Sequence, residues 1–207
     1  TAVSYREVPT DTLVKLPEAH DSQQIFGLKQ GALVGTSSAR RKAQLLHYRP
    51  DVSVQDIRVN VPTRLRKLQE GPFDAILLVT AGLKRLEIDL SGKEVFEMNP
   101  REFIPAPAQG VLAFQTLRDD WPTRRLLKKI HHPEVSTRTN VERKILKLAG
   151  GGCHMPLGAY CEVDEEGNFH VWAAKANTWQ SACAFTRLSS STHFGLAEQV
   201  LADLGGA

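Results

Sequence analysis

The order of apolar runs and amphipathic segments between residues 32 and 86 constrains the fold more than any other feature of this sequence. Three apolar runs, at residues 32–38, 52–59 and 73–82, have the length and residue types of β-strands. A segment with helical spacing follows each of them: residues 39–49, 60–71 and 83–88. A strand–helix order that occurs three times predicts an α/β lobe with a mainly parallel sheet and helices on its faces. The last strand is expected to be buried on both faces because its apolar run is continuous.

Capping residues mark the starts of two of these helices. Ser37 or Ser38 precedes the first helix, where a hydroxyl oxygen can accept a hydrogen bond from an unpaired N–H group. Asn60 can cap the second helix, Pro62 fits its first turn, and Gly71 can end it. Helix N-termini that follow parallel strands lie at one edge of the sheet, which is the usual ligand crevice. Their unpaired N–H groups favour an anion at this edge.

Arginines occur repeatedly at the same predicted edge. They lie at a helix start, at a strand end, in a first helical turn and after the buried strand: Arg40, Arg41, Arg58, Arg64 and Arg85. Guanidinium groups gathered there would repel one another unless an anion lay between them. Arginine suits carboxylates and phosphates because its planar group donates two parallel hydrogen bonds. The alternative is a set of unrelated, solvated surface arginines, and the shared edge favours a common anion site.

The sequence after residue 103 predicts a crossover and then a second domain. Residues 104–114 contain two prolines and one glycine, which is typical of a crossover into another strand. Two amphipathic helices, a hairpin that turns at Asp164–Gly167, a further strand and a final helix are expected after it: residues 123–132, 136–151, 157–176, 181–189 and 193–204. Residues from about 131 onward are therefore expected to form a small, separate α+β domain.

Composition indicates a cytoplasmic protein without nucleic-acid or membrane partners. No apolar run approaches the roughly 18 residues of a membrane helix, and residues 1–11 lack the features of a signal peptide. A net charge of +3 is too small to indicate nucleic-acid binding. Three cysteines without a CxxC pair are expected to be reduced thiols. Cys161 and Cys183 lie in alternating runs and are predicted to be packing residues.

The third cysteine lies in an unusual stretch, GGGCHMPLGAY, at residues 150–160. Three glycines before Cys153 argue against ordinary packing and favour close approach of another molecule. A Cys–His dyad with His154, His131 or His132 would indicate a thiol-dependent hydrolase. Adjacent loop residues usually diverge, however, and the two upstream histidines end a predicted helix. The spacing of Cys and His fits no usual metal site.

Four segments occur in the order VGTSSARRKAQL, TRLRKLQEGPFDAILLVTAGLKRL, IPAPAQGVLAF and GGGCHMPLGAY. Together they resemble the hydroxymethylbilane synthase, or porphobilinogen deaminase, family, from about Glu7 to the C-terminal helix. The resemblance implies a transferase of porphyrin and haem biosynthesis that deaminates four porphobilinogen units and joins them into linear hydroxymethylbilane. It implies two lobes like those of periplasmic binding proteins and a small third domain. A loop cysteine of that domain carries a dipyrromethane cofactor in the family.

The same resemblance assigns site residues and domain bounds. It implies that Cys153 carries dipyrromethane through a thioether. The positions that match cofactor-binding residues are Thr36, Ser38, Arg40, Arg41 and Arg58, and those that match substrate-binding residues are Arg64, Arg85 and Gln109. The implied parts are a hinge with a remnant of the first domain, an α/β lobe, a crossover back to the first domain and a cofactor-attachment domain: residues 1–14, 15–103, 104–130 and 131–207. The full-length protein is expected to be a monomer.

The chain departs from the family's pattern at several points. Most of the family's first domain, with its catalytic aspartate, has no counterpart, and neither Asp56 nor Asp74 replaces that aspartate. Val59 and Pro62 stand where the family has glycine, and proline removes a donor N–H group. This fragment alone is therefore expected to be inactive. A non-catalytic carboxylate-binding module of the same fold is the alternative.

Overall fold

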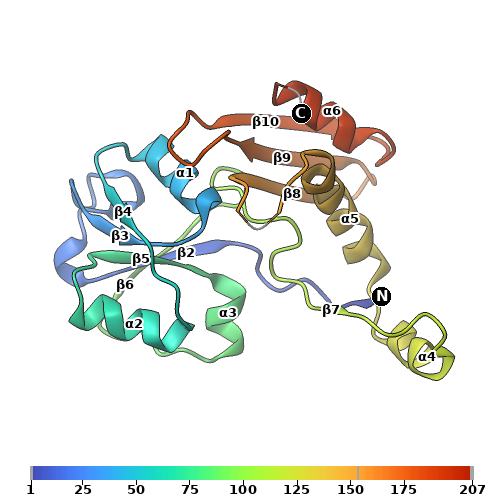
Figure 1. Cartoon of the computed structure of the whole chain (residues 1–207), viewed down its shortest axis with the longest axis horizontal. Coiled ribbons are helices and arrows are strands. Elements are labelled where there is room, and N and C mark those ends of the chain that lie inside the picture. Colours follow the sequence, from blue (N-terminus) through green and yellow to red (C-terminus); the bar gives the residue numbers. More distant parts are fainter. Residues whose placement is uncertain (1, 153, 206–207) are drawn as a thin grey trace.

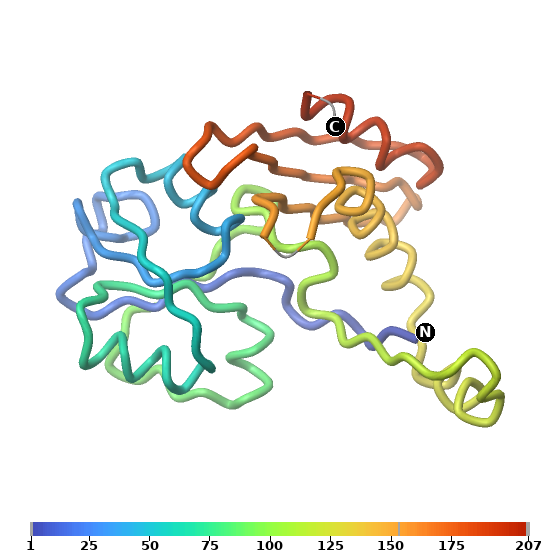
Figure 2. The backbone as a smooth tube through the Cα atoms, in the orientation of Figure 1, coloured from blue at the N-terminus to red at the C-terminus, as the bar shows by residue number. Residues whose placement is uncertain are grey.

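The structure is a computed structural model that describes residues 2–152 and 154–205. Figure 1 shows a five-stranded sheet with helices α1, α2 and α3, and a three-stranded sheet with helices α5 and α6. A two-stranded pairing and helix α4 extend away from both sheets (Figure 1). The chain trace in Figure 2 runs from the N-terminal segment through the five-stranded sheet, back beside its own start, and on to the second sheet. This arrangement agrees with the predicted α/β lobe followed by a small α+β part.

The first sheet has the strand order β4-β3-β5-β2-β6. Its strands are β2 (Asp11–Lys15), β3 (Leu33–Gly35), β4 (Ser53–Gln55), β5 (Ala75–Val79) and β6 (Glu94–Glu97). Strands β4, β3 and β5 pair in parallel, whereas β2 is antiparallel to both β5 and β6. Four of the five strands therefore share one direction, and the predicted mainly parallel sheet is confirmed.

Strand β5 lies in the middle of this sheet and is buried on both faces, as predicted. Leu77 packs with Leu45 of α1 (Ala39–Tyr48) in one core. Ile76 points to the opposite core, where it meets Leu68 of α2 (Val61–Glu70) and Leu83 of α3 (Thr80–Arg85). A strand that buries both faces needs apolar residues at consecutive positions, which explains its continuous apolar run.

The helix caps agree with local sequence signals. Ser38 caps α1 by accepting a hydrogen bond from the N–H of Arg41, and Asn60 caps α2 through the N–H of Thr63. Pro62 lies in the first turn of α2, which ends before the cap residue Gly71. Both helices begin at residues whose side chains satisfy an otherwise unpaired donor.

Several predicted boundaries are wrong, among them those of β4 and α3 in the first sheet and its helices. Strand β4 ends at Gln55, because the chain then bends so that the N–H of Ile57 donates to Ser37 Oγ at 2.9 Å. Helix α3 begins at Thr80 rather than at residue 83, directly after β5. The sequence analysis also contained no strand at β2 or β6, and it therefore missed the antiparallel half of the sheet.

The second sheet is an antiparallel meander of β8 (Leu157–Val163), β9 (Phe169–Lys175) and β10 (Ala184–Ser190). Helices α5 (Pro133–Leu148) and α6 (Leu196–Asp203) cover one face with an apolar core. The other face contacts the first part of the molecule through Trp172, Ala43 of α1 and Ile104. The predicted hairpin, third strand and final helix are confirmed, whereas the proposed domain bounds stay a prediction.

The remaining elements are short. Strands β1 (Ala2–Val3) and β7 (Ala113–Phe114) pair antiparallel, and α4 (Trp121–Lys129) follows β7. Two 3-10 helices, η1 (Pro17–Ala19) and η2 (Ile25–Gly27), lie between β2 and β3. Helix α4 contains no buried residue. In the described part of the chain, no helix combines the length and apolarity that a membrane span requires.

Candidate anion-binding site

The candidate site lies at the edge of the first sheet where its parallel strands end. Gly35, the last residue of β3, is in register with Gln55, the last residue of β4, and with Ile76 of β5. Strand β2 runs in the opposite direction, so its first residue, Asp11, is in register with Val79 at the end of β5. The antiparallel strand therefore places a carboxylate at the edge where helices α1 and α3 begin.

Asp11 binds two buried arginines at once. Arg40 Nη1 lies 2.7 Å from Asp11 Oδ2, while Arg41 donates from Nη2 and Nε to Asp11 Oδ1 at 2.7 and 3.0 Å. The side chains of Arg40, Arg41 and Asp11 are 5%, 9% and 0% exposed, respectively. Burial alone would raise the pKa of Asp11, but the charges of the two arginines and their hydrogen bonds outweigh it and lower the pKa to about 2. The anion between these arginines is thus a residue of the chain itself.

Gln109 completes this cluster from the crossover. Its Nε2 donates to Asp11 Oδ1 at 3.1 Å and to the carbonyl oxygen of Pro9 at 2.7 Å, and its Oε1 accepts from Arg40 Nη2 at 3.3 Å. Arg40 Nη1 also donates to the carbonyl oxygen of Ile104 at 2.9 Å. The structure therefore brings Arg40, Arg41 and Gln109 together around Asp11.

Arg64 and Arg85 lie beside this cluster without a counter-ion. Arg64 is half-buried, and its Nε donates to the carbonyl oxygen of Val59 at 2.8 Å. The pKa of Arg64 is lowered, first by burial and then by the positive charge of Arg41. The two cations are therefore close enough to repel each other. Arg85 is exposed and donates to the carbonyl oxygen of Gly110, the residue after Gln109, at 3.1 Å. Neither Arg64 nor Arg85 forms an ion pair with a described residue.

The charges in this group do not cancel. Arg40, Arg41 and Arg64 contribute three positive charges, and Asp11 contributes one negative charge, which leaves +2. Two cations in a half-buried setting repel each other more strongly than in open water, because the effective dielectric constant is lower there. The arrangement favours a bound carboxylate or phosphate beside Arg64 and Arg41.

Two hydroxyl groups lie at the same edge. Thr36 is fully buried, and its Oγ1 accepts a hydrogen bond from the N–H of Ser38 at 3.3 Å. Ser38 Oγ accepts from the N–H of Arg41 at 3.4 Å. Among the described residues neither hydroxyl donates a hydrogen bond, but only Ser38 is partly exposed and can offer its donor to a ligand.

Arg58 is not joined to the cluster by any contact in the described part of the chain. Its side chain is 79% exposed and lies 3.4 Å from Asp56 Oδ2. Asp56 also binds Lys42 Nζ at 2.5 Å, which makes it a surface counter-ion. Asp74 has a structural role, since it accepts from the N–H of Leu33 at 2.8 Å and pairs with Lys29 at 2.6 Å.

The cysteines differ in what the structure tells about them. Cys153 lies outside the described residues. Cys161 and Cys183 are buried in the cores around the second sheet, and burial raises their pKa values to about 12 and about 11. Both are therefore neutral packing thiols at physiological pH, as the sequence analysis predicted. No group of three metal-ligating side chains occurs within residues 2–152 and 154–205.

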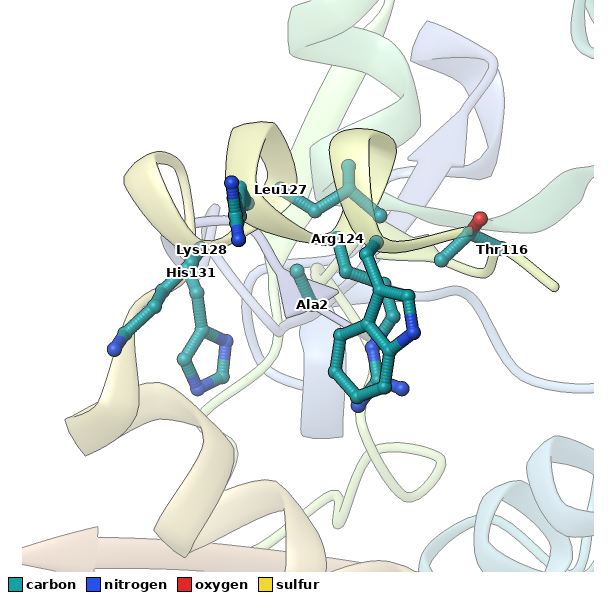
Figure 3. A pocket seen from close by; sticks show the side chains of 8 residues that line it. Ala2, Thr116, Arg124, Leu127, Lys128 and His131 are labelled. Atoms are coloured by element: carbon teal, nitrogen blue, oxygen red, sulfur yellow. The ribbon is translucent and has the colours of Figure 1, made fainter. Parts of the chain in front are cut away.

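The histidines upstream of the cysteine loop have partners of their own. His131 Nδ1 accepts a hydrogen bond from the N–H of Val3 at 3.2 Å, and His132 Nδ1 lies 3.2 Å from Glu134 Oε1. His131 also lines a cavity of about 310 Å³ between β1 and α4, together with Trp121 and Arg124 (Figure 3). None of the residues assigned to the cofactor or the substrate lines this cavity.

Asp11 is the residue of the candidate site that the sequence analysis missed. The signal was present, because Asp11 begins the strand-like run DTLVK. That run is flanked by proline-containing segments and lies before the repeated strand–helix pattern. A short run of this kind indicates a strand, but it does not reveal that the strand will pair antiparallel with β5.

Comparison with known proteins identifies the family. Residues 1–125 match the family model described as "Porphobilinogen deaminase, dipyromethane cofactor binding domain". The porphobilinogen deaminase of Shouchella clausii is 45% identical over 168 residues, which cover 80% of this chain and 52% of that protein. Those of Chloroherpeton thalassium and Thermus thermophilus are 41% and 38% identical, over 82% and 81% of this chain and 52% and 60% of theirs.

Similar solved structures are more distant. An arginine-specific periplasmic binding protein of Salmonella typhimurium has a TM-score of 0.40 and 14% identity, over 65% of this chain and 61% of its own. An amino-acid transporter's substrate-binding protein from Streptococcus pneumoniae, bound to L-arginine, has a TM-score of 0.37 and 12% identity, over 62% and 52%. Scores this low add nothing to the fold described above.

The family match extends over the whole five-stranded sheet, its arginine cluster and the crossover that carries Gln109. The chain spans about half the length of the relatives named above. The chain belongs to the porphobilinogen deaminase family.

Proposed function

We propose that this chain is the anion-binding and cofactor-attachment part of a hydroxymethylbilane synthase. The complete enzyme would deaminate four porphobilinogen units and join them into linear hydroxymethylbilane, in the cytoplasm and as a monomer. The observation that carries this proposal is the uncompensated charge of +2 around Asp11, at the ligand edge of the first sheet. Porphobilinogen bears two carboxylates, so a growing chain of such units needs cations that are already in place.

The arginines would divide this task according to their burial. Arg40 and Arg41 are held by Asp11 and by backbone carbonyl oxygens, so they would act as a fixed source of positive potential. Arg64, Arg85 and Arg58 are more exposed and would contact carboxylates directly. Ser38 would donate its hydroxyl hydrogen to the same ligand, and the fully buried Thr36 would hold the backbone N–H of Ser38 in place.

The residues present fit a dipyrromethane cofactor, whose carboxylates match the net positive edge. We propose that Cys153 holds it through a thioether, because Cys161 and Cys183 are buried and neutral. When bound, this group supplies the pyrrole primer to which substrate units are added. The chain's own residues would bind its carboxylates, orient it and exclude water from the charged groups.

Mass spectrometry of the full-length protein tests the attachment. We expect Cys153 to carry the mass of a dipyrromethane, and the Cys153→Ala variant to carry none and to be inactive. Full turnover of porphobilinogen by protein with an unmodified Cys153 would refute the assignment. The present chain alone is expected to show no turnover, since no residue in it matches the family's catalytic aspartate.

A non-catalytic carboxylate-binding module is the second candidate. Val59 and Pro62, which stand where the family has glycine, favour it. Calorimetry combined with an ammonia assay on porphobilinogen separates the two candidates: a module binds without releasing ammonia, whereas the complete enzyme releases one ammonia for each unit added.

A further inference from the structure

A polar cavity of about 450 Å³ lies on the face of the second sheet that is opposite helices α5 and α6, and it shares no residue with the Asp11 cluster. Its walls come from four places: the loop after β6, helix α5, the β8–β9 hairpin and strand β10. The side chains that matter here are Arg101, Arg138, Glu162, His170, Trp172 and Arg187. The cavity has the size of an ordinary small-molecule site.

The register of the three strands explains why these side chains meet. Tyr160, Trp172 and Arg187 form one cross-strand row, and Glu162, His170 and Ser189 form the next row on the same face. Residues two positions apart on a strand point to the same face, so the side chains of these two cross-strand rows share one surface of the sheet. The opposite face is the one that α5 and α6 cover.

Trp172 forms the floor of the cavity and holds two guanidinium groups. The Arg101 and Arg187 Cζ atoms lie 5.0 and 5.3 Å from the centre of its ring. Such cation–π contacts fix the plane of a guanidinium group while leaving its N–H donors available. Arg187 is therefore oriented without an acceptor having been used.

The two carboxylates in the cavity are already engaged. Glu162 Oε2 accepts from Arg101 at 2.6 and 3.1 Å, and its Oε1 accepts from Tyr160 at 2.7 Å. Asp164 Oδ2 lies 3.0 Å from His170 Nε2 and accepts from Asn168 at 3.0 Å. These acids neutralise Arg101 and orient His170, and they leave the other two arginines unpaired.

Arg187 makes no hydrogen bond or ion pair with any described residue. Arg138 donates only from Nε, to the carbonyl oxygen of Glu134 at 3.3 Å, so its terminal N–H groups are also free of described partners. Two arginines with free terminal donors thus face one polar cavity. An arginine that is only a solvated surface residue needs no fixed orientation, whereas Arg187 is held against the buried ring of Trp172.

We propose that this cavity binds a small multivalent oxyanion, a phosphate or a di- or tricarboxylate, between Arg138 and Arg187. The ligand would contact strands β9 and β10, helix α5 and, through Arg101, the loop that follows β6. It would therefore link the second sheet to the first part of the molecule and stabilise their contact. This site is independent of the function proposed for the Asp11 cluster.

Calorimetric titration of the 207-residue chain with citrate, inorganic phosphate and acetate at constant ionic strength tests this inference. Constant ionic strength is needed because surface attraction is screened by salt. We expect citrate or phosphate to bind and acetate to bind at least tenfold more weakly. Which of the first two binds more tightly identifies a carboxylate or a phosphate ligand. Arg187→Gln and Arg138→Gln should each weaken binding at least tenfold, and Arg187→Lys should retain part of it.

Arg66→Gln is the matched control. Arg66 is exposed on α2, so this substitution removes the same charge at a site far from the strands of the second sheet. NMR adds the location: the indole N–H signal of Trp172 should shift on titration, and those of Trp121 and Trp179 should not. If Arg187→Gln fails to fold, Arg138→Gln and the Trp172 signal still decide. Equal weakening by Arg66→Gln, a Trp172 signal that does not move, or no binding of either multivalent anion would overturn the proposal.

Discussion

Replacing Asp11 with asparagine tests whether the buried arginines depend on an internal counter-ion. The substitution keeps the size of the side chain and removes its charge. Asparagine retains one acceptor oxygen, but its NH₂ group would face guanidinium donors that now have no acceptor. The side chains of Arg40 and Arg41 would remain 5% and 9% exposed, each with a positive charge that water cannot reach.

The magnitude follows from the contacts of Asp11. Its carboxylate accepts one hydrogen bond from Arg40, two from Arg41 and one from Gln109. Removing one partner of a buried ion pair costs about 3–5 kcal/mol, because the remaining charge is left unpaired. For a chain of this size, that loss corresponds to a fall in Tm of roughly 6–20 °C.

Urea denaturation followed by circular dichroism measures this loss. Asp119→Asn is the matched control, because Asp119 is exposed and its side chain makes no hydrogen bond or ion pair with a described residue. We expect the control to stay within about 0.5 kcal/mol of the parent. A loss below about 1 kcal/mol for Asp11→Asn would refute the reasoning, since it would mean that water or another anion balances the two arginines.

Three further predictions concern Asp11 and other buried groups. Because the folded-state pKa of Asp11 is lowered from 3.8 to about 2, its stabilising effect is present above pH 4 and should disappear as the pH falls to about 2. The stability difference between the parent and Asp11→Asn, measured by urea titration at each pH, should shrink in that window, and a constant difference would contradict the assignment. Iodoacetamide at pH 7.5 should label neither Cys161 nor Cys183 in the native chain, as judged by mass spectrometry, and should label both after denaturation, because both thiols are buried and their pKa values are raised. Glu142→Gln should cost about 3 kcal/mol in urea, with exposed Glu165→Gln as the control, because the fully buried Glu142 carboxylate binds Arg6 at 2.6 Å.

The elements that could be predicted from sequence are those with local signals. Strand β5 was recognisable because five consecutive apolar residues are needed by a strand buried on both faces. Helices α1 and α2 were recognisable because Ser38 and Asn60 satisfy their first N–H groups within three residues along the chain. The β8–β9 hairpin was recognisable from its turn, where Gly167 has a φ of +86°.

The elements that could not be predicted depend on distant partners. Strand β2 is stabilised by pairing with β5, whose residues lie 60 to 68 positions later, and it contains Lys15, a charged residue that is 2% exposed. Lys15 Nζ donates to the carbonyl oxygens of Phe26 and Gly27 at 3.0 and 2.7 Å, so its charge is satisfied by a loop that no local pattern reveals. A buried lysine in a short run argues against a strand unless such acceptors are known.

The candidate site shows the same division between local and distant information. The positions of Arg40, Arg41 and Arg64 followed from strand ends and helix starts, which are local. Their charge balance did not, because Asp11 reaches the site only through the antiparallel pairing of β2. Sequence reasoning therefore assigned to a ligand an anion that the chain supplies for two of the arginines.

This internal anion changes what a ligand has to do at the edge of the sheet. If Arg40 and Arg41 lacked Asp11, a carboxylate ligand would have to neutralise both of them, and the empty site would strongly disfavour folding. With Asp11 in place, the two arginines stay fixed and charged, and a net positive charge remains beside Arg64. A ligand carboxylate then meets donors that are already oriented, which lowers the reorganisation that binding requires. The same buried contact that stabilises the fold thus prepares the edge for anions.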